Sequence, residues 1–148
     1  MPKSATQTLG LIKESPVPIC FNQIKFHADI TVSTNVIGIF KDALEASDAQ
    51  YHARFKEGES ARGLIYDRAH IIDCMLHYAW HQFSWSDNIS LIAIGGYGRG
   101  ELHPKSDIDL LLLLTNDPDT KDYESSQEFL TLLWDIGLNI GHSVRTLD

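Results

Sequence analysis

The sequence predicts an α/β domain in which a pair of helices comes before a small sheet. Apolar residues recur at helical spacing in the first half of the chain, whereas the second half alternates short apolar runs, typical of strands, with one more helical segment. The expected order is helix, helix, strand, turn, strand, helix, strand. The helical segments are 36–57, 60–83 and 127–136, and the strand segments are 90–94, 107–114 and 138–146.

Composition indicates one packed domain. The chain has 148 residues, 12 Lys and Arg against 20 Asp and Glu, a net charge of −8 and 43% hydrophobic residues. A chain of this length buries well over half of the surface that it exposes when unfolded. Neither disorder nor a disulfide-stapled miniprotein is therefore expected.

Charge and cysteine content exclude further classes. An acidic chain, with a pI near 5.2, lacks the basic face that binds long nucleic acid, although small anions carried by Mg²⁺ remain compatible with it. Cys20 and Cys74 are far apart and form no metal-binding or disulfide pattern. No signal peptide and no membrane-spanning apolar run are visible, so we expect a cytoplasmic protein without membrane contact.

The first 34 residues show no sustained period and contain Pro16 and Pro18, so residues 1–34 are predicted to form an extended arm. The domain proper is expected over residues 35–148. Its first helix begins after the capping residues Ser33, Thr34 and Asn35 and ends at Gly58.

The second helix begins near Ser60 and carries one basic residue in its apolar stripe, Arg68. Two interpretations of Arg68 stay open: its stem packs while its head reaches water, or its guanidinium crosses to the acidic site described below. His77 and His81 have the spacing of metal ligands, but no third ligand accompanies them, so a solvated stripe shared with His70 is favoured.

The strand segments flank a glycine turn. The apolar run 90–94 stops at Gly95 and Gly96, which predicts a buried strand leaving into a turn. The run 110–114 is continuously apolar, so we expect a central strand covered by helices on both faces. Residues 116–119 break the pattern, and Gly137 separates the last helix from the last strand.

Asp107 and Asp109 are the strongest candidates for chemistry. Side chains alternate along a strand, so both carboxylates project from one face, where they repel each other without a cation. Mg²⁺ is commonly held by one or two carboxylates together with phosphate oxygens, which a triphosphate supplies. The glycines at 95 and 96 let the backbone approach phosphate, and Arg99 adds a forked cation. Other phosphate motifs fail on spacing, because Glu101 replaces the third glycine of a dinucleotide fingerprint and no Gly-Lys-Ser/Thr occurs.

The strand, Gly-Gly turn and Asp-x-Asp arrangement resembles the DNA polymerase β-like nucleotidyltransferase superfamily. The longer sequence motifs at 95–102 (GGYGRGEL) and 106–111 (SDIDLL) are similar to those of the bacterial PII uridylyltransferase/uridylyl-removing enzymes. Weaker similarities to the same enzymes lie at Arg68 with Asp73 and at 141–146 (GHSVRT).

The resemblance implies a polymerase β-like fold, a small mixed sheet flanked by helices with an N-terminal helical pair. It also implies transfer of UMP from UTP to a tyrosine of the nitrogen-regulatory protein PII, with pyrophosphate leaving. Asp107 and Asp109 would hold two Mg²⁺ ions for an in-line displacement. The nucleotide phosphates would be bound by Gly95, Gly96, Arg99 and Ser106.

Two departures from the family matter. Its members continue into hydrolase and glutamine-sensing domains, so we expect a chain truncated at its C-terminal side, without uridylyl removal or glutamine sensing. The third carboxylate usual on a neighbouring strand is missing from 138–146, and Asp148 comes very late. Either the ligand lies beyond this chain, another group substitutes, or the fragment is inactive alone. Ser143 and Arg145, on the more polar face of that strand, are secondary candidates.

Three functions therefore remain open at this level. The favoured one is a protein-modifying nucleotidyltransferase. The others are a non-catalytic fragment that binds nucleotide or protein, and nucleotidyl transfer to RNA or a small molecule, of which the RNA version is disfavoured by the acidity.

Overall fold

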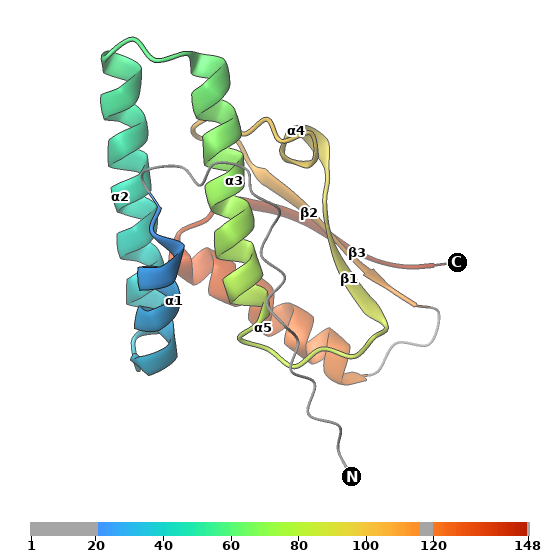
Figure 1. Ribbon diagram of the computed structural model, residues 1–148. Coiled ribbons are helices and arrows are strands. Elements are labelled where there is room, and N and C mark those ends of the chain that lie inside the picture. The colour runs from blue at the N-terminus through green and yellow to red at the C-terminus, as the bar shows by residue number, and fades with distance from the viewer. Residues whose placement is uncertain (1–20, 116–119, 148) are drawn as a thin grey trace.

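The computed structural model describes residues 21–115 and 120–147, which form a layer of helices packed against one three-stranded sheet (Figure 1). In chain order the elements are α1 (Gln23–Val32), α2 (Val36–Lys56), α3 (Ala61–Trp80), β1 (Ile89–Ala93), α4 (Gly95–Gly98), β2 (Ile108–Leu114), α5 (Thr120–Ile136) and β3 (Ile140–Thr146).

The expected fold class is confirmed: helices precede a small mixed sheet. Strand β2 is central, antiparallel to β1 and parallel to β3. The parallel pair requires a crossover, which α5 provides between β2 and β3. In this register Leu112 lies beside Leu91 on one side and Val144 on the other.

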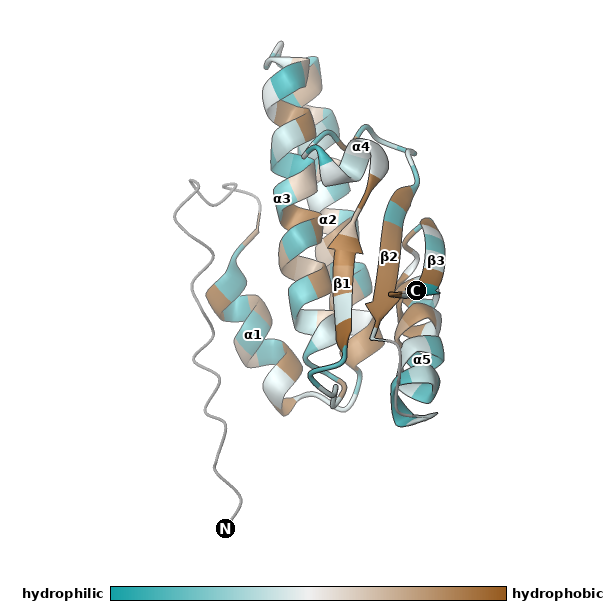
Figure 2. Cartoon of the chain, turned by 90° about the vertical axis from the view of Figure 1, so that its right-hand side faces the viewer, coloured by the Kyte–Doolittle hydropathy of each residue, from teal (hydrophilic) through white to brown (hydrophobic). Residues whose placement is uncertain are grey.

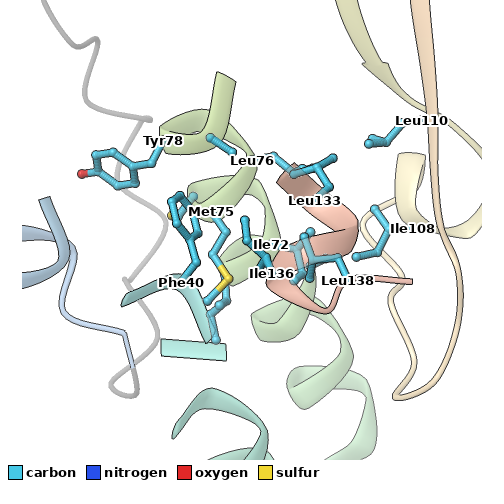
Figure 3. Close-up of a cluster of buried hydrophobic side chains, with 14 of the residues drawn as sticks. Phe40, Ile72, Met75, Leu76, Tyr78, Ile108, Leu110, Leu133, Ile136 and Leu138 are labelled. Atoms are coloured by element: carbon cyan, nitrogen blue, oxygen red, sulfur yellow. The ribbon is translucent and has the colours of Figure 1, made fainter. Parts of the chain in front are cut away.

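The hydrophobic core lies between the helices and one face of the sheet. Ile108 and Leu110 of β2 meet Ile72 of α3 and Leu133 of α5 in one buried cluster (Figure 3). In Figure 2 the sheet lies in front of α2 and α3. The helices therefore fix the sheet from a single side.

The other face of β2 corrects the sequence prediction. Burial alternates strictly along the strand, with Ile108, Leu110, Leu112 and Leu114 buried and the residues between them only half-buried. The neighbouring Ile92 and Ile94 are 36% and 38% exposed. Coverage on both faces was wrong for the described residues, because the crossover helix packs on the same side as the helical pair.

The extended arm is also corrected in part. Residues 23–32 form α1, capped by the Asn22 side chain, which accepts a 2.9 Å hydrogen bond from the Lys25 amide. Phe26 packs edge-on against Phe40 of α2. A helix this short is marginal alone, so tertiary packing decides its form. The prediction for residues 1–20, Cys20 included, lies outside the described residues, as do the breaker residues 116–119.

The predicted helical pair is confirmed at both N-termini. Asn35 caps α2 by accepting a 3.0 Å hydrogen bond from the Gly38 amide, and α3 begins directly after Ser60. Cys74, in the middle of α3, is a buried free thiol. Within the described ranges, no helix is both long and apolar enough to cross a bilayer.

Candidate active site

Asp109, the second residue of β2, has its carboxylate between two glycines of different elements. A methyl group on Gly95 of α4 would lie 2.8 Å from Oδ2 of Asp109, and one on Gly141 of β3 would overlap Oδ1. Gly141 is also the register partner of Asp109 in the parallel pair. Missing side chains on both sides thus leave room for the carboxylate at this edge of the sheet.

Asp107 lies at the same edge, directly before β2. Its Oδ1 accepts a hydrogen bond from the Asn139 side chain, while the Asn139 carbonyl accepts a 2.8 Å bond from the Ile108 amide. Asn139 directly precedes β3 and lies two residues before Gly141, and residues two apart in an extended segment face the same side, so the contacts of both aspartates lie on one face of the sheet. No basic side chain in the described part of the chain forms an ion pair with either aspartate.

The glycine turn of the prediction is a single helical turn, α4, beside these carboxylates. Gly95 has a φ of 63°, a left-handed conformation that costs glycine little. The turn is closed by a 2.8 Å bond from the Gly98 amide to the Ile94 carbonyl. Among the described residues, no acceptor takes a hydrogen bond from the amides of Gly95 or Gly96, so both donors stay available to a ligand.

The remaining phosphate-binding candidates lie around this turn with different partners. The Arg99 guanidinium is 3.7 Å from the Glu101 carboxylate and also 3.7 Å from the position of a Gly96 methyl. Ser106 is exposed, and its amide donates a 3.1 Å bond to the His103 carbonyl. In the described part of the chain, neither side chain forms a hydrogen bond or ion pair with the aspartates, so the phosphate role of both remains a prediction.

Arg68 does not reach the acidic site. Its guanidinium forms an ion pair with Asp48 of α2, so the interpretation in which it crosses to the aspartates is wrong. The physical reason is proximity: α2 and α3 pack side by side and supply a carboxylate closer than the sheet does. Arg68 therefore links the helical pair, as Arg54 also does by pairing with Asp67 of α3.

The secondary candidates on β3 lie farther along the sheet. Ser143 pairs with Leu111 and Arg145 with Leu113, two and four residues beyond the register position of Asp109. At about 3.3 Å per residue, Arg145 is roughly 13 Å from that position. It lines a separate groove with Tyr123 and Gln127 of α5, so the structure does not bring it to the carboxylates.

The histidine pair at the C-terminal end of α3 does not form a metal site with other described residues. The rings of His77 and His81 are 4.3 Å apart, and Nε2 of His77 is buried without a hydrogen-bond partner. Burial, and then the charge of His81, lower the pKa of His77. Across the described residues, no three His, Cys, Asp or Glu side chains come together as a metal site.

Two contacts of the site were not predicted as such. Asn139 touches Asp107 and Gly141 flanks Asp109, whereas the sequence predicted only Ser143 and Arg145 as site candidates on that strand. The parallel register between β2 and β3 brings them to the aspartates, and no local pattern encodes that register.

Comparison with known proteins gives a consistent result. A model of the nucleotidyltransferase domain matches residues 80–142, which include both aspartates and the glycine turn. Bifunctional uridylyltransferase/uridylyl-removing enzymes of Pseudomonas putida and Pseudomonas fluorescens are 47% and 49% identical to this chain, over 133 and 137 residues.

These matches cover 88% of the chain but only 15% of each relative, so the chain spans a small part of their length. No solved structure matches. Over 88% of its length the chain is homologous to the nucleotidyltransferase region of the bacterial uridylyltransferase/uridylyl-removing enzymes, and the matched domain includes the glycine turn and both aspartates.

Proposed function

We propose that this chain carries a Mg²⁺-dependent transferase site that moves UMP from UTP to a tyrosine hydroxyl of the regulatory protein PII, in the cytoplasm. The observation that carries the proposal is the Asp109 carboxylate between Gly95 and Gly141, beside Asp107 and the free amides of α4. The uridine and PII assignments come from the homology to uridylyltransferases.

The donor set at this edge fits Mg²⁺. It offers carboxylate oxygens, which Mg²⁺ prefers, and the glycines on both sides of Asp109 leave space that a larger residue would fill. Asp107 and Asp109 would hold the ion, which supplies charge neutralisation to the triphosphate when bound. Without an ion pair to a basic residue, the two negative charges are free to serve a cation.

The chain's own residues would then orient the nucleotide. The Gly95 and Gly96 amides would donate to phosphate oxygens, and Arg99 would add positive charge at the rim of the site. In the reaction the tyrosine oxygen bonds to the α-phosphorus, the bond to the β-phosphate oxygen breaks, and pyrophosphate leaves with the tyrosine proton released. An in-line geometry requires the acceptor hydroxyl to enter opposite the leaving group.

The test is transfer of radiolabel from α-labelled UTP to PII in the presence of Mg²⁺. We expect Asp109→Asn and Asp107→Asn to lower transfer at least a hundredfold, since removing one preorganised charge at a reacting phosphate costs that order. Asp135→Asn, an exposed carboxylate on α5, is the matched control and retains full transfer. Normal transfer by both site variants, at unchanged melting temperature, would contradict the proposal.

A second function, nucleotide binding without turnover, is favoured by one observation. Among the described residues, no group of three acidic, histidine or cysteine side chains comes together that could hold a metal ion. Binding without transfer predicts that Mg²⁺ and UTP raise the melting temperature, because a ligand that prefers the folded state stabilises it. PII would then remain unlabelled even at high enzyme concentration.

A further inference from the structure

Tyr97 is the one side chain in the glycine turn, and it points away from the aspartates. The residue is 5% exposed and belongs to the main hydrophobic core. Its hydroxyl donates a hydrogen bond to Oδ1 of Asp73, a residue in the middle of α3. The turn beside the carboxylates is thereby connected to the helical layer.

Backbone hydrogen bonds also hold the turn: the Gly98 amide donates to the Ile94 carbonyl at 2.8 Å, and the Glu101 amide donates to the Gly96 carbonyl at 3.0 Å. A methyl group on Gly98 would lie 2.7 Å from the Ala93 carbonyl oxygen, and one on Gly96 would lie 3.2 Å from the Glu101 carbonyl oxygen. These short distances leave little room for a side chain at either glycine. Among the described residues, the Tyr97 to Asp73 bond is the only side-chain hydrogen bond that joins α4 to another element.

The direction of this bond is fixed by chemistry. Burial first, and then the charge and hydrogen bond of Asp73, raise the pKa of Tyr97 far above its ordinary value, so the hydroxyl keeps its proton and donates. Asp73 lies at a cavity of about 440 Å³ that Tyr97, His77 and Trp80 also line. Loss of solvation there raises the pKa of Asp73, although the Tyr97 hydrogen bond favours its charged form.

Stability alone does not require such a pair. The bond is only partly buried, because Tyr97 is buried and Asp73 is exposed. A hydrogen bond contributes little net stability, whereas a satisfied polar pair fixes one arrangement of the groups that it joins. Here the joined groups are the rigid middle of α3 and the turn whose amides border Asp109. The pair therefore sets where those amides stand relative to the carboxylates.

We infer that Asp73 and Tyr97 are positioning residues for the nucleotide: their hydrogen bond holds α4 where its amides meet the triphosphate at the aspartate pair. This inference rests on the proposed function and adds two residues to it. Neither residue touches the nucleotide, so both act through the backbone of Gly95 and Gly96. Loss of the bond lets the turn shift and weakens the hydrogen bonds from its amides to phosphate, while the metal-binding carboxylates stay in place.

The experiment compares Tyr97→Phe with Tyr78→Phe. Tyr78 is a buried tyrosine of α3 (Figure 3) whose hydroxyl has no hydrogen-bond partner among the described residues, so its loss is a matched control. Affinity for UTP with Mg²⁺ is measured by calorimetry, and affinity for Mn²⁺ alone by its electron paramagnetic resonance signal. Hydrogen exchange is followed in the free protein at the hydrogen-bonded amides of the turn, those of Gly98 and Arg99.

We expect Tyr97→Phe to weaken UTP binding roughly tenfold, the size of one hydrogen bond to a charged group. Mn²⁺ affinity should stay within a factor of about two, because both aspartates are unchanged. The turn amides should exchange faster in Tyr97→Phe and not in Tyr78→Phe. Asp73→Asn, which keeps an acceptor oxygen for the tyrosine, should restore most of the affinity that Asp73→Ala loses.

Three results would overturn the inference: equal UTP affinity in Tyr97→Phe and wild type, equal loss in Tyr78→Phe, or unchanged exchange of the turn amides. A failure of the proposed function looks different. In that case the wild-type chain itself shows no Mg²⁺-dependent UTP binding, which overturns the transferase site and the positioning role together.

Discussion

The two faces of β2 differ in what they contribute. Ile108, Leu110, Leu112 and Leu114 face the helices and are at most 3% exposed, whereas Asp109, Leu111 and Leu113 face away from them and are half-buried. In Figure 2 strands β1 and β2 are coloured mostly as hydrophobic, with a hydrophilic band on β2 near α4. One strand thus anchors the fold with one face and presents the site with the other.

This difference teaches how the site can remain charged. The carboxylates lie at the end of a strand whose opposite face is tightly packed, so the backbone is rigid while the side chains stay near solvent. Burying both aspartates would have cost their desolvation, which a partner must compensate. Changes on the packed face should therefore cost stability, and changes on the open face should cost function.

The largest effect is expected from the packed face. Leu112→Ala removes a fully buried side chain and should lower the free energy of unfolding by roughly 2–5 kcal/mol. Leu113→Ala, one residue along the same strand but on the other face, should cost about 1 kcal/mol. Urea denaturation measures both. Equal losses would break the comparison, because the second face would then also be covered.

A smaller effect, on function alone, is expected from Gly141→Ala. The added methyl overlaps Oδ1 of Asp109, and the carboxylate can rotate away without moving the backbone. Mn²⁺ affinity and uridylyl transfer should fall about tenfold, with little change in melting temperature. Gly63→Ala is the matched control: nothing lies within 4 Å of its new methyl, and in a helix it should slightly stabilise the protein. Unchanged Mn²⁺ affinity in Gly141→Ala would argue against a metal role for Asp109.

The smallest expected effect is on the pH dependence of stability, and it comes from His77 in the helical layer. The folded protein lowers the pKa of His77, first through desolvation and then through His81. The unfolded chain therefore binds more protons below about pH 6.5, and acidification costs stability. His77→Gln should reduce the fall in melting temperature between pH 7 and pH 5. A fall as steep as in wild type would place the acid-sensitive group elsewhere.

Local patterns predicted most of the fold. The structure agrees with three local features: the Asn35 cap of α2, the start of α3 after Ser60, and the alternation of side chains between the two faces of β2. The prediction failed for α1, whose short helix depends on contacts to Phe40 and Tyr78 in other elements. It also failed for the second face of β2, since an apolar run does not reveal which side the crossover helix takes.

The site was predictable only where its residues are close in sequence. Asp107, Asp109 and Gly95 lie within one motif, and the structure brings Asp109 and Gly95 together. Of the two interpretations of Arg68, the one that takes it to the aspartates fails, because the packing of α2 on α3 brings it to Asp48, which lies far from it in sequence. Asn139 and Gly141 reach the aspartates through a long-range register.

The sequence by itself determined the helical pair, the glycine turn and the two aspartates, because spacing, capping residues and strand alternation act over a few neighbouring positions. Tertiary structure alone decided which residues surround those aspartates and how the turn is tied to α3. The physical reason is that strand register, helix crossover side and the bond from Tyr97 to Asp73 depend on contacts between segments distant in the chain.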